Sequence, residues 1–180
     1  MKAVILTGQY ATEQEVFYPM YRLDEEGIEW HLATPDGKQT VGASGLKIVP
    51  THMFTNIDIG HYDLCIIPGG AKAMEYLRQN LYLLTLLMHA HALGQVIASI
   101  CHGAQLLISA GLVKDRDISG YYSIKDDILN AGGRFSPAAV VRDGRIITSP
   151  HYKYCGFWMA EALRVLKLPR GVGEGDVGVE

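Results

Sequence analysis

Short apolar runs that end at glycine, proline or serine alternate along this chain with segments of helical periodicity. Continuous apolar runs of this length are typical of strands that are buried on both faces. They predict strands at residues 2–7, 29–33, 63–67 and 96–99. The helical patterns predict helices from residue 12 to a stop at Gly27, and at residues 72–93, 104–110, 123–130 and 156–166.

Turn signals predict two hairpins and the start of the first helix. Asp36-Gly37 and residues 42–45 mark the turns of a small hairpin, and Asp143-Gly144 joins strands at 138–141 and 145–148. The run from Thr12 to Glu15 matches a capping box. Pro19 is expected to kink the helix that follows.

The alternation of strands and helices predicts a parallel sheet covered by helices on both faces, because parallel strands need crossover connections. Ligands of such folds bind beyond the carboxyl ends of the strands. The segments to inspect are therefore residues 8–15, 68–75, 100–103 and 149–154. One domain over residues 1–168 accounts for the pattern, and the glycine-rich residues 169–180 are expected to form a flexible tail.

Composition narrows the class of protein. The 180 residues are 48% hydrophobic and 19% charged, which predicts a soluble globular domain rather than a disordered chain. The formal net charge of -3 lacks the basic excess of nucleic-acid-binding proteins. No apolar stretch approaches the length of about 18 residues that a membrane-spanning helix needs, and no signal peptide is evident. Three widely spaced cysteines indicate no disulfide framework and favour a reducing, cytoplasmic location.

Cys101 carries the strongest chemical signal, because it lies between a predicted strand and a predicted helix and has small neighbours at Ser99 and Gly103. Small flanking residues allow a sharp turn that lifts a nucleophile out of the sheet. The start of the helix is expected to favour the thiolate form. The alternative is a small buried hydrophobic residue, as most free cysteines are.

The other candidates have structural alternatives. Cys65 is predicted to pack in the core, whereas Cys155 either packs or forms a second reactive thiol. His102 either folds back toward Cys101 as a base or packs near the helix start. The remaining six histidines lack the spacing of metal ligands, so no metal is expected.

Two further features suggest parts of a site. The turn Pro68-Gly69-Gly70 exposes backbone N–H groups that, with the N–H of His102, would hold an oxyanion, although two glycines also suit a turn with positive φ. Glu15 is explained equally well by the capping box.

Four motifs in this order resemble the PfpI/ThiJ family, over nearly the whole chain to about residue 168. Along the chain they are Glu-Val-Phe-Tyr-Pro at 15–19, Ile-Ile-Pro-Gly-Gly at 66–70, the Cys-His-Gly run within 98–111, and residues 124–132. The resemblance implies the flavodoxin-like three-layer sandwich of the class I glutamine-amidotransferase-like superfamily, with a mostly parallel central sheet. It also implies a homodimer or higher homo-oligomer.

The resemblance implies roles for individual residues. Cys101 becomes the nucleophile, and Glu15 the carboxyl group hydrogen-bonded to its sulfur. His102 is assisted by a carboxylate from an adjacent subunit, for which Glu75 is the candidate. Tyr121, or Tyr122 in its place, is the active-site tyrosine. Oxyanion and substrate contacts are then assigned to Gly69, Gly70, Gly103, Tyr121 and His151.

The rim of the pocket departs from the family pattern. Ser44 stands where a basic residue or histidine is expected, and residues 150–158 are rewritten. Four aromatic residues in that segment either line a pocket or pack the last helix, and packing is favoured. They are Tyr152, Tyr154, Phe157 and Trp158.

The resemblance implies a cofactor-independent cysteine enzyme that acts on a small carbonyl compound, in a glyoxalase- or deglycase-like reaction, or hydrolyses an amide or peptide. Both reactions require Cys101, and only hydrolysis depends on His102 as proton donor. The alternative class is an oxidative-stress sensor or chaperone whose Cys101 is oxidised to a sulfinic acid stabilised by Glu15. Neither a nucleic acid nor a membrane is an expected partner.

Overall fold

Seven strands form the central sheet in the order β10-β11-β7-β6-β1-β2-β5 in the computed structural model, which describes residues 1–169. All neighbouring strands are parallel except β10 and β11. The strands are β1 (Lys2–Leu6), β2 (Glu29–Thr34), β5 (His52–Met53), β6 (Leu64–Ile67), β7 (Val96–Ile100), β10 (Val141–Asp143) and β11 (Ile146–Ser149). Every residue of β6 and β7 is buried, which explains why β6 is apolar throughout and why Ser99 is the one polar residue of β7.

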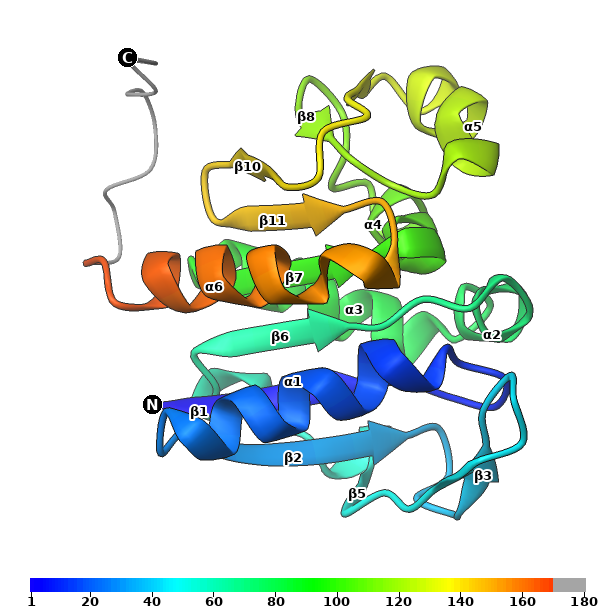
Figure 1. The fold of residues 1–180 in the computed structure, drawn as a ribbon, viewed down its shortest axis with the longest axis vertical. Helices are drawn as coiled ribbons and strands as arrows, with labels where there is room; N and C mark the ends of the chain where they lie inside the picture. The colour runs from blue at the N-terminus through cyan, green and yellow to red at the C-terminus, as the bar shows by residue number, and fades with distance from the viewer. Residues whose placement is uncertain (170–180) are drawn as a thin grey trace.

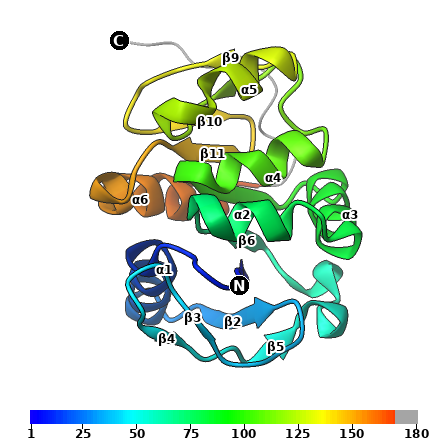
Figure 2. The same ribbon diagram turned by 90° about the vertical axis from the view of Figure 1, so that its right-hand side faces the viewer.

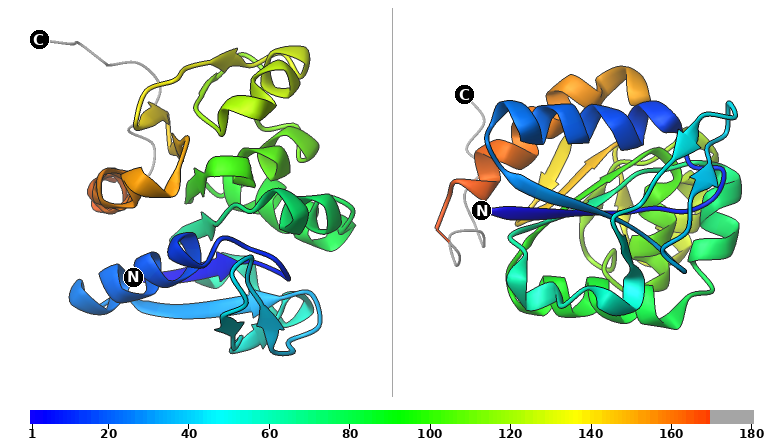
Figure 3. Two further views of the ribbon diagram at one scale, coloured as in Figure 1. Left: turned by 45° about the vertical axis from the view of Figure 1, so that its right-hand side comes forward. Right: turned by 90° about the horizontal axis from the view of Figure 1, so that it is seen from below.

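Helices cover both faces of the sheet and confirm the predicted three-layer sandwich. The helices α1 (Glu13–Glu25) and α6 (Cys155–Leu166) cover one face (Figure 1). On the other face lie α2 (Ala71–Leu77), α3 (Leu81–Ala92) and α4 (Ala104–Ser109) (Figure 2). Figure 3, in its right panel, shows the sheet between the two helical layers. Helix α5 (Lys125–Asn130) lies beyond β10, at the end of the molecule away from β5.

Several short elements surround the sheet. The predicted hairpin forms from β3 (Thr40–Val41) and β4 (Lys47–Ile48). The parallel pair β8 (Asp117–Ile118) and β9 (Arg134–Phe135) was not predicted, since two-residue strands have no periodicity to detect.

Two helix predictions differ from the structure. The predicted helix at 72–93 is two helices, because the Asn80 side chain accepts a hydrogen bond from the Leu83 N–H and starts α3. The capping box is wrong, since the side chain of Thr12 makes no capping hydrogen bond and Glu15 is bonded elsewhere. Helix α1 runs on through Pro19. The predicted tail lies outside the described residues, apart from Pro169.

The topology creates a crevice at one end of the sheet. Strand β1 lies between β2 and β6, with Ile5 opposite Leu32 on one side and Ile66 on the other. The chain therefore continues from β1 to β2 on one side of β1, and later returns to form β6 on the other side. Such a switch point opens a crevice at the carboxyl ends of the strands, which is where ligands of these folds bind.

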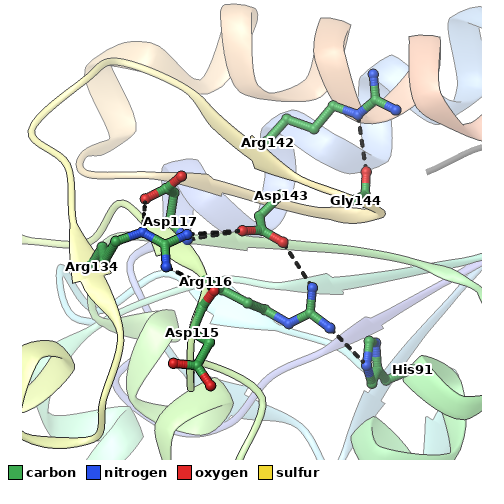
Figure 4. Close-up of polar contacts among 8 residues, drawn as sticks. All are labelled: His91, Asp115, Arg116, Asp117, Arg134, Arg142, Asp143 and Gly144. Atoms are coloured by element: carbon green, nitrogen blue, oxygen red, sulfur yellow. Dashed lines mark hydrogen bonds and ion pairs between the residues drawn. The ribbon is translucent and has the colours of Figure 1, made fainter. Parts of the chain in front are cut away.

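A network of charged side chains lies beside the β10–β11 turn, away from the carboxyl ends of the parallel strands (Figure 4). Asp143, beside the β10–β11 turn, accepts from Arg116 at 2.8 Å and from the Asp117 N–H at 2.9 Å. Arg116 also lies 3.2 Å from the Nε2 atom of His91, and Arg134 donates to Asp117 at 2.7 Å. Burial and the neighbouring Arg116 lower the pKa of His91, which keeps its ring neutral as an acceptor. Asp143 thus ties β8 to β10.

Replacing Asp143 with alanine is expected to destabilise the protein by about 1–3 kcal/mol, because a half-buried Arg116 and the Asp117 N–H lose their acceptor. Urea unfolding of the variant measures this change. Glu161→Ala is the control, because it breaks an exposed pair with Arg164 on α6 and should cost no more than about 0.5 kcal/mol. Equal losses in the two variants would contradict a structural role for the network.

Candidate active site

Cys101 occupies a strained position at the end of β7. The chain turns there through residues 101–103 into α4, and Cys101 has a φ of 59°. A left-handed backbone at a residue with a Cβ costs on the order of 1–2 kcal/mol, and such strain concentrates at functional sites. A Cβ on Gly103 would lie 2.7 Å from the Ile67 carbonyl oxygen, so glycine permits the turn to approach β6. The predicted strand–cysteine–helix turn is confirmed, and Gly103 lies behind Cys101 rather than in the pocket lining.

Glu15, in the first turn of α1, lies fully buried beside Cys101. Its Oε2 atom accepts a 2.7 Å hydrogen bond from the Gly69 N–H. Its Oε1 atom is buried without a well-formed hydrogen bond, yet the carboxyl group is close enough to Cys101 to affect the pKa of both groups. Burial raises the pKa of Glu15 to about 7, against the smaller lowering effects of the Gly69 N–H and the Cys101 thiol. Both protonation states of Glu15 are therefore populated near neutral pH, as a proton carrier requires.

The environment of Cys101 favours the thiol over the thiolate. Burial and the adjacent Glu15 raise the pKa of Cys101 above its ordinary value, and the backbone N–H groups of His102 and Gly70 lower it by less. The expectation of a stabilised thiolate is therefore wrong, because desolvation and a neighbouring carboxylate outweigh the backbone dipoles. Such a thiol becomes a nucleophile by giving its proton to a nearby base.

The glycine pair after β6 divides its backbone groups between two tasks. The Gly69 N–H is committed to Glu15, whereas those of Gly70 and His102 are directed at the Cys101 sulfur. Of the predicted oxyanion donors, Gly70 and His102 are thus available at the reacting atom. A Cβ on Gly69 would lie 2.7 Å from Glu15 Oε2 and 2.8 Å from Cys101 Cβ, so only glycine fits there.

His102 folds back onto Cys101. Its Nδ1 atom lies 3.4 Å from the Cys101 sulfur and its Nε2 atom 3.2 Å from Ser123 Oγ. The ring stacks on Tyr121, with 4.7 Å between centroids. Burial lowers the pKa of His102. Ser123, from a turn far along the chain, was not predicted, because no local pattern marks it as a partner of His102.

Glu75 lies on the exposed side of α2, next to the buried Met74. Within the described chain no hydrogen bond joins Glu75 to His102. A contact with His102 would have to come from another subunit, so the role of Glu75 stays a prediction.

A pocket of about 440 Å³ opens above Cys101. Its aromatic wall continues from Tyr121 to His151, 5.9 Å away between ring centroids, and on to Tyr152 at 4.1 Å. The ring of Tyr122 lies tilted beside that of Tyr121, but Tyr122 is 75% exposed and lies outside the lining, which favours Tyr121 as the pocket tyrosine. The pocket is lined by Tyr10, Thr12, Ala43, Gly70, Ala71, Lys72, Cys101, His102, Tyr121, His151 and Tyr152.

The aromatic residues of the rewritten segment have different positions. Trp158 is fully buried, as the packing prediction requires. Tyr152 lines the pocket, and Phe157 is 69% exposed, so packing is wrong for both of them. The pocket therefore uses this segment for part of its wall.

The start of α1 also holds the β3–β4 loop against the pocket. The buried Glu13 accepts hydrogen bonds from the N–H groups of Ser44 at 2.7 Å and Leu46 at 3.3 Å. Ala43 in this loop lines the pocket. Ser44, at the position where a basic residue was expected, contributes its backbone to this anchorage. The sequence pattern did not indicate the role of Glu13.

The other two cysteines are buried away from the pocket lining. Cys65 is fully buried, and burial raises its pKa to about 12, which confirms its place in the core. Burial and the charge of Glu15 raise the pKa of Cys155 to about 12, which favours packing over a second reactive thiol. All three thiols are free.

Two kinds of feature are absent from residues 1–169. This part of the chain contains no cluster of three or more His, Cys, Asp or Glu side chains that would suit a metal ion. Nor does it contain a helix with the length and apolar character to cross a membrane.

Comparison with known proteins agrees with this geometry. Residues 1–164 match the DJ-1/PfpI family. A deglycase of Thermococcus kodakarensis and the deglycase PfpI of Pyrococcus furiosus are each 34% identical over 167 residues, which cover 93% of this chain and 100% of theirs. A crystal structure from Anabaena variabilis, of a protein with DJ-1/ThiJ/PfpI-like and ferritin-like domains, superimposes with a TM-score of 0.88 at 28% identity. The match covers 92% of this chain and 48% of that one. This chain belongs to the DJ-1/PfpI family.

Proposed function

We propose that this protein is a cysteine-dependent enzyme that acts on a small carbonyl compound by a glyoxalase- or deglycase-like reaction. The observation that carries the proposal is the buried Glu15, with a pKa of about 7, beside the Cys101 thiol beneath an open pocket. Two relatives that match over their full length are named deglycases, which supports the same reaction type.

The first step joins the Cys101 sulfur to the aldehyde carbon of a 2-oxoaldehyde. The thiol proton passes to Glu15, the carbon–sulfur bond forms, and the electron pair of the carbonyl bond moves to oxygen. The N–H groups of Gly70 and His102 stabilise this oxyanion. Glu15 then returns the proton to the oxygen and gives a hemithioacetal.

The second step moves hydrogen between the two carbons. Glu15 removes the proton from the carbon that bears sulfur and gives it to the neighbouring carbonyl oxygen, so that an enediol forms. A proton then adds to the neighbouring carbon while the hydroxyl group on the sulfur-bearing carbon loses its proton to Glu15. The product is the thioester of a 2-hydroxy acid, so one carbon is oxidised as the other is reduced. Water hydrolyses the thioester, which releases the 2-hydroxy acid and restores the thiol. The sum is one 2-oxoaldehyde and one water converted to one 2-hydroxy acid.

The alternatives have weaker support in the geometry. Amide hydrolysis needs His102 to protonate a leaving group, and burial lowers the pKa of its ring, which disfavours the charged acid. A peroxide sensor needs an exposed thiol of low pKa, whereas Cys101 is 6% exposed and has a raised pKa.

A time course of methylglyoxal loss and lactate formation tests the proposal. Lactate is expected from the wild type, and His102→Ala should reduce kcat by about threefold to tenfold, since it removes a ring beside sulfur and leaves nucleophile and base in place. The absence of lactate from folded wild-type protein would overturn the proposal. Peptide hydrolysis that His102→Ala abolishes would support the hydrolase instead.

A further inference from the structure

We propose that the substrate of this pocket carries a carboxylate and that Lys72 binds it. The inference rests on the proposed carbonyl chemistry and names its substrate class, a carbonyl compound with an anionic group at the far end. Lys72 is then a specificity-determining residue for the reaction.

The charge of the pocket lining favours an anion. Lys72 is the one lysine or arginine of the lining, and the lining contains no acidic residue. Burial lowers the pKa of both His102 and His151, and the charge of Lys153 adds to this effect at His151, so the neutral form of each ring is favoured. Glu15 lies behind Cys101, outside the lining. A ligand in the pocket therefore meets one positive charge.

The ammonium group of Lys72 is available to a ligand. Within residues 1–169, no carboxylate lies within 4.0 Å of it, whereas Lys2, Lys38 and Lys167 each form an ion pair. The Nζ atom of Lys72 lies 4.5 Å from the centroid of the Tyr10 ring, which also lines the pocket. A cation–π contact positions an ammonium group and leaves its N–H donors free.

Tyr10, whose ring lies beneath the Lys72 ammonium group, has a strained backbone. Tyr10 has a φ of 66°, a conformation that costs on the order of 1–2 kcal/mol for a residue with a Cβ. Its N–H donates to the Val41 carbonyl at 2.8 Å. Its own carbonyl oxygen would lie 2.6 Å from a Cβ on Gly70, so the two segments are in close contact. Non-glycine residues in this conformation concentrate at functional sites.

The dimensions of the pocket suit a larger molecule than a three-carbon aldehyde. A volume of about 440 Å³ lies within the range of sites for drug-sized ligands, about 300–1,000 Å³. The wall of Tyr121, His151 and Tyr152 offers flat apolar surface to the body of such a ligand. In such a ligand the carbonyl would meet Cys101, the apolar body would lie on the aromatic wall, and the carboxylate would bind Lys72.

Alkylation of Cys101 tests the anion site without any turnover. Iodoacetate and iodoacetamide are of similar size and differ in charge, so the ratio of their rates reports the local potential. Lys72→Met is expected to lower the iodoacetate-to-iodoacetamide ratio by about fivefold at low salt, the size expected for one contact charge pair in water. Added salt should reduce the difference between wild type and variant. Cys101→Ser identifies any labelling of other cysteines.

Lys153→Met is the matched control. Lys153 also lies over a tyrosine, 4.8 Å from the centroid of Tyr154, in the segment next to His151, but it does not line the pocket. Its removal should change the ratio far less than the removal of Lys72. An unchanged ratio in Lys72→Met, or an equal loss in Lys153→Met, would overturn the inference.

Turnover separates this inference from the proposed function. The wild type should prefer 4-carboxyphenylglyoxal to phenylglyoxal in kcat/KM, and Lys72→Met should remove the preference by slowing the carboxylated substrate alone. Turnover of both compounds without dependence on Lys72 would reject the carboxylate site and leave the function standing. A Lys72-dependent alkylation ratio without turnover of any 2-oxoaldehyde would support the anion site and reject the reaction.

Discussion

Replacing Cys101 with alanine is expected to abolish 2-hydroxy acid formation, with a loss in kcat of about 10³-fold or more, because no other group forms the carbon–sulfur bond. Cys65→Ala is the matched control, since that thiol is also buried but lies outside the pocket lining and away from Glu15, and it should retain activity. The lactate time course measures both variants. Substantial activity in Cys101→Ala would reject covalent catalysis by this residue.

The strain at Cys101 predicts a further difference between two inactive variants. Alanine retains a Cβ at a φ of 59°, whereas glycine adopts that conformation without steric cost. Cys101→Gly should therefore be more stable than Cys101→Ala by about 1 kcal/mol in urea unfolding. Equal stability, or a less stable glycine variant, would show that the surrounding structure does not store strain at this position.

Replacing Glu15 with glutamine is expected to lower kcat by about 10²–10⁴-fold, since glutamine cannot accept the thiol proton. The wild-type rate should rise with pH as Glu15 loses its proton near pH 7. Glu161→Gln, at a carboxyl group of α6 outside the pocket lining, is the control for changes in net charge and should leave rate and profile unchanged. A Glu15→Gln enzyme with near wild-type kcat would contradict the assigned base.

The same substitution should stabilise the fold above neutral pH. The pKa of Glu15 is raised in the native state, so the native protein binds more protons than the unfolded chain, and wild-type stability falls as pH rises from 4.5 to about 7. The loss approaches roughly 3 kcal/mol above pH 7. Glu15→Gln removes this loss of stability. Plots of the free energy of unfolding against pH for wild type and variant should therefore diverge across this window and run parallel outside it. Parallel curves throughout would mean that Glu15 ionises without cost.

Much of the sandwich was predictable because it depends on local pattern. Strands buried on both faces have continuous apolar sequences, as in β6, which ends at Pro68. The two-residue strands β8 and β9 are held by pairing across the chain and by the Asp143 network, so local pattern did not reveal them. The capping box failed because a tertiary contact, from Glu15 to Gly69, replaced a local one.

The site was predictable in position but not in its energetics. The rule that places ligands after parallel strands led to Cys101, Gly70 and His151. The direction of the thiol pKa was wrong because desolvation depends on depth, which spacing along the chain does not report. Ser123 and Lys72 were missed, since a serine and a surface lysine acquire meaning only from the partners that folding brings to them.

The two carboxyl groups at the start of α1 have a consequence for how the pocket works. Glu13 holds the loop that carries Ala43, on one side, and Glu15 holds Gly69 beside the nucleophile, on the other. A tilt of this single helical turn would displace the loop and the base together. A shift of the loop and a shift of the proton acceptor of Cys101 would then occur together, because one helical turn holds both.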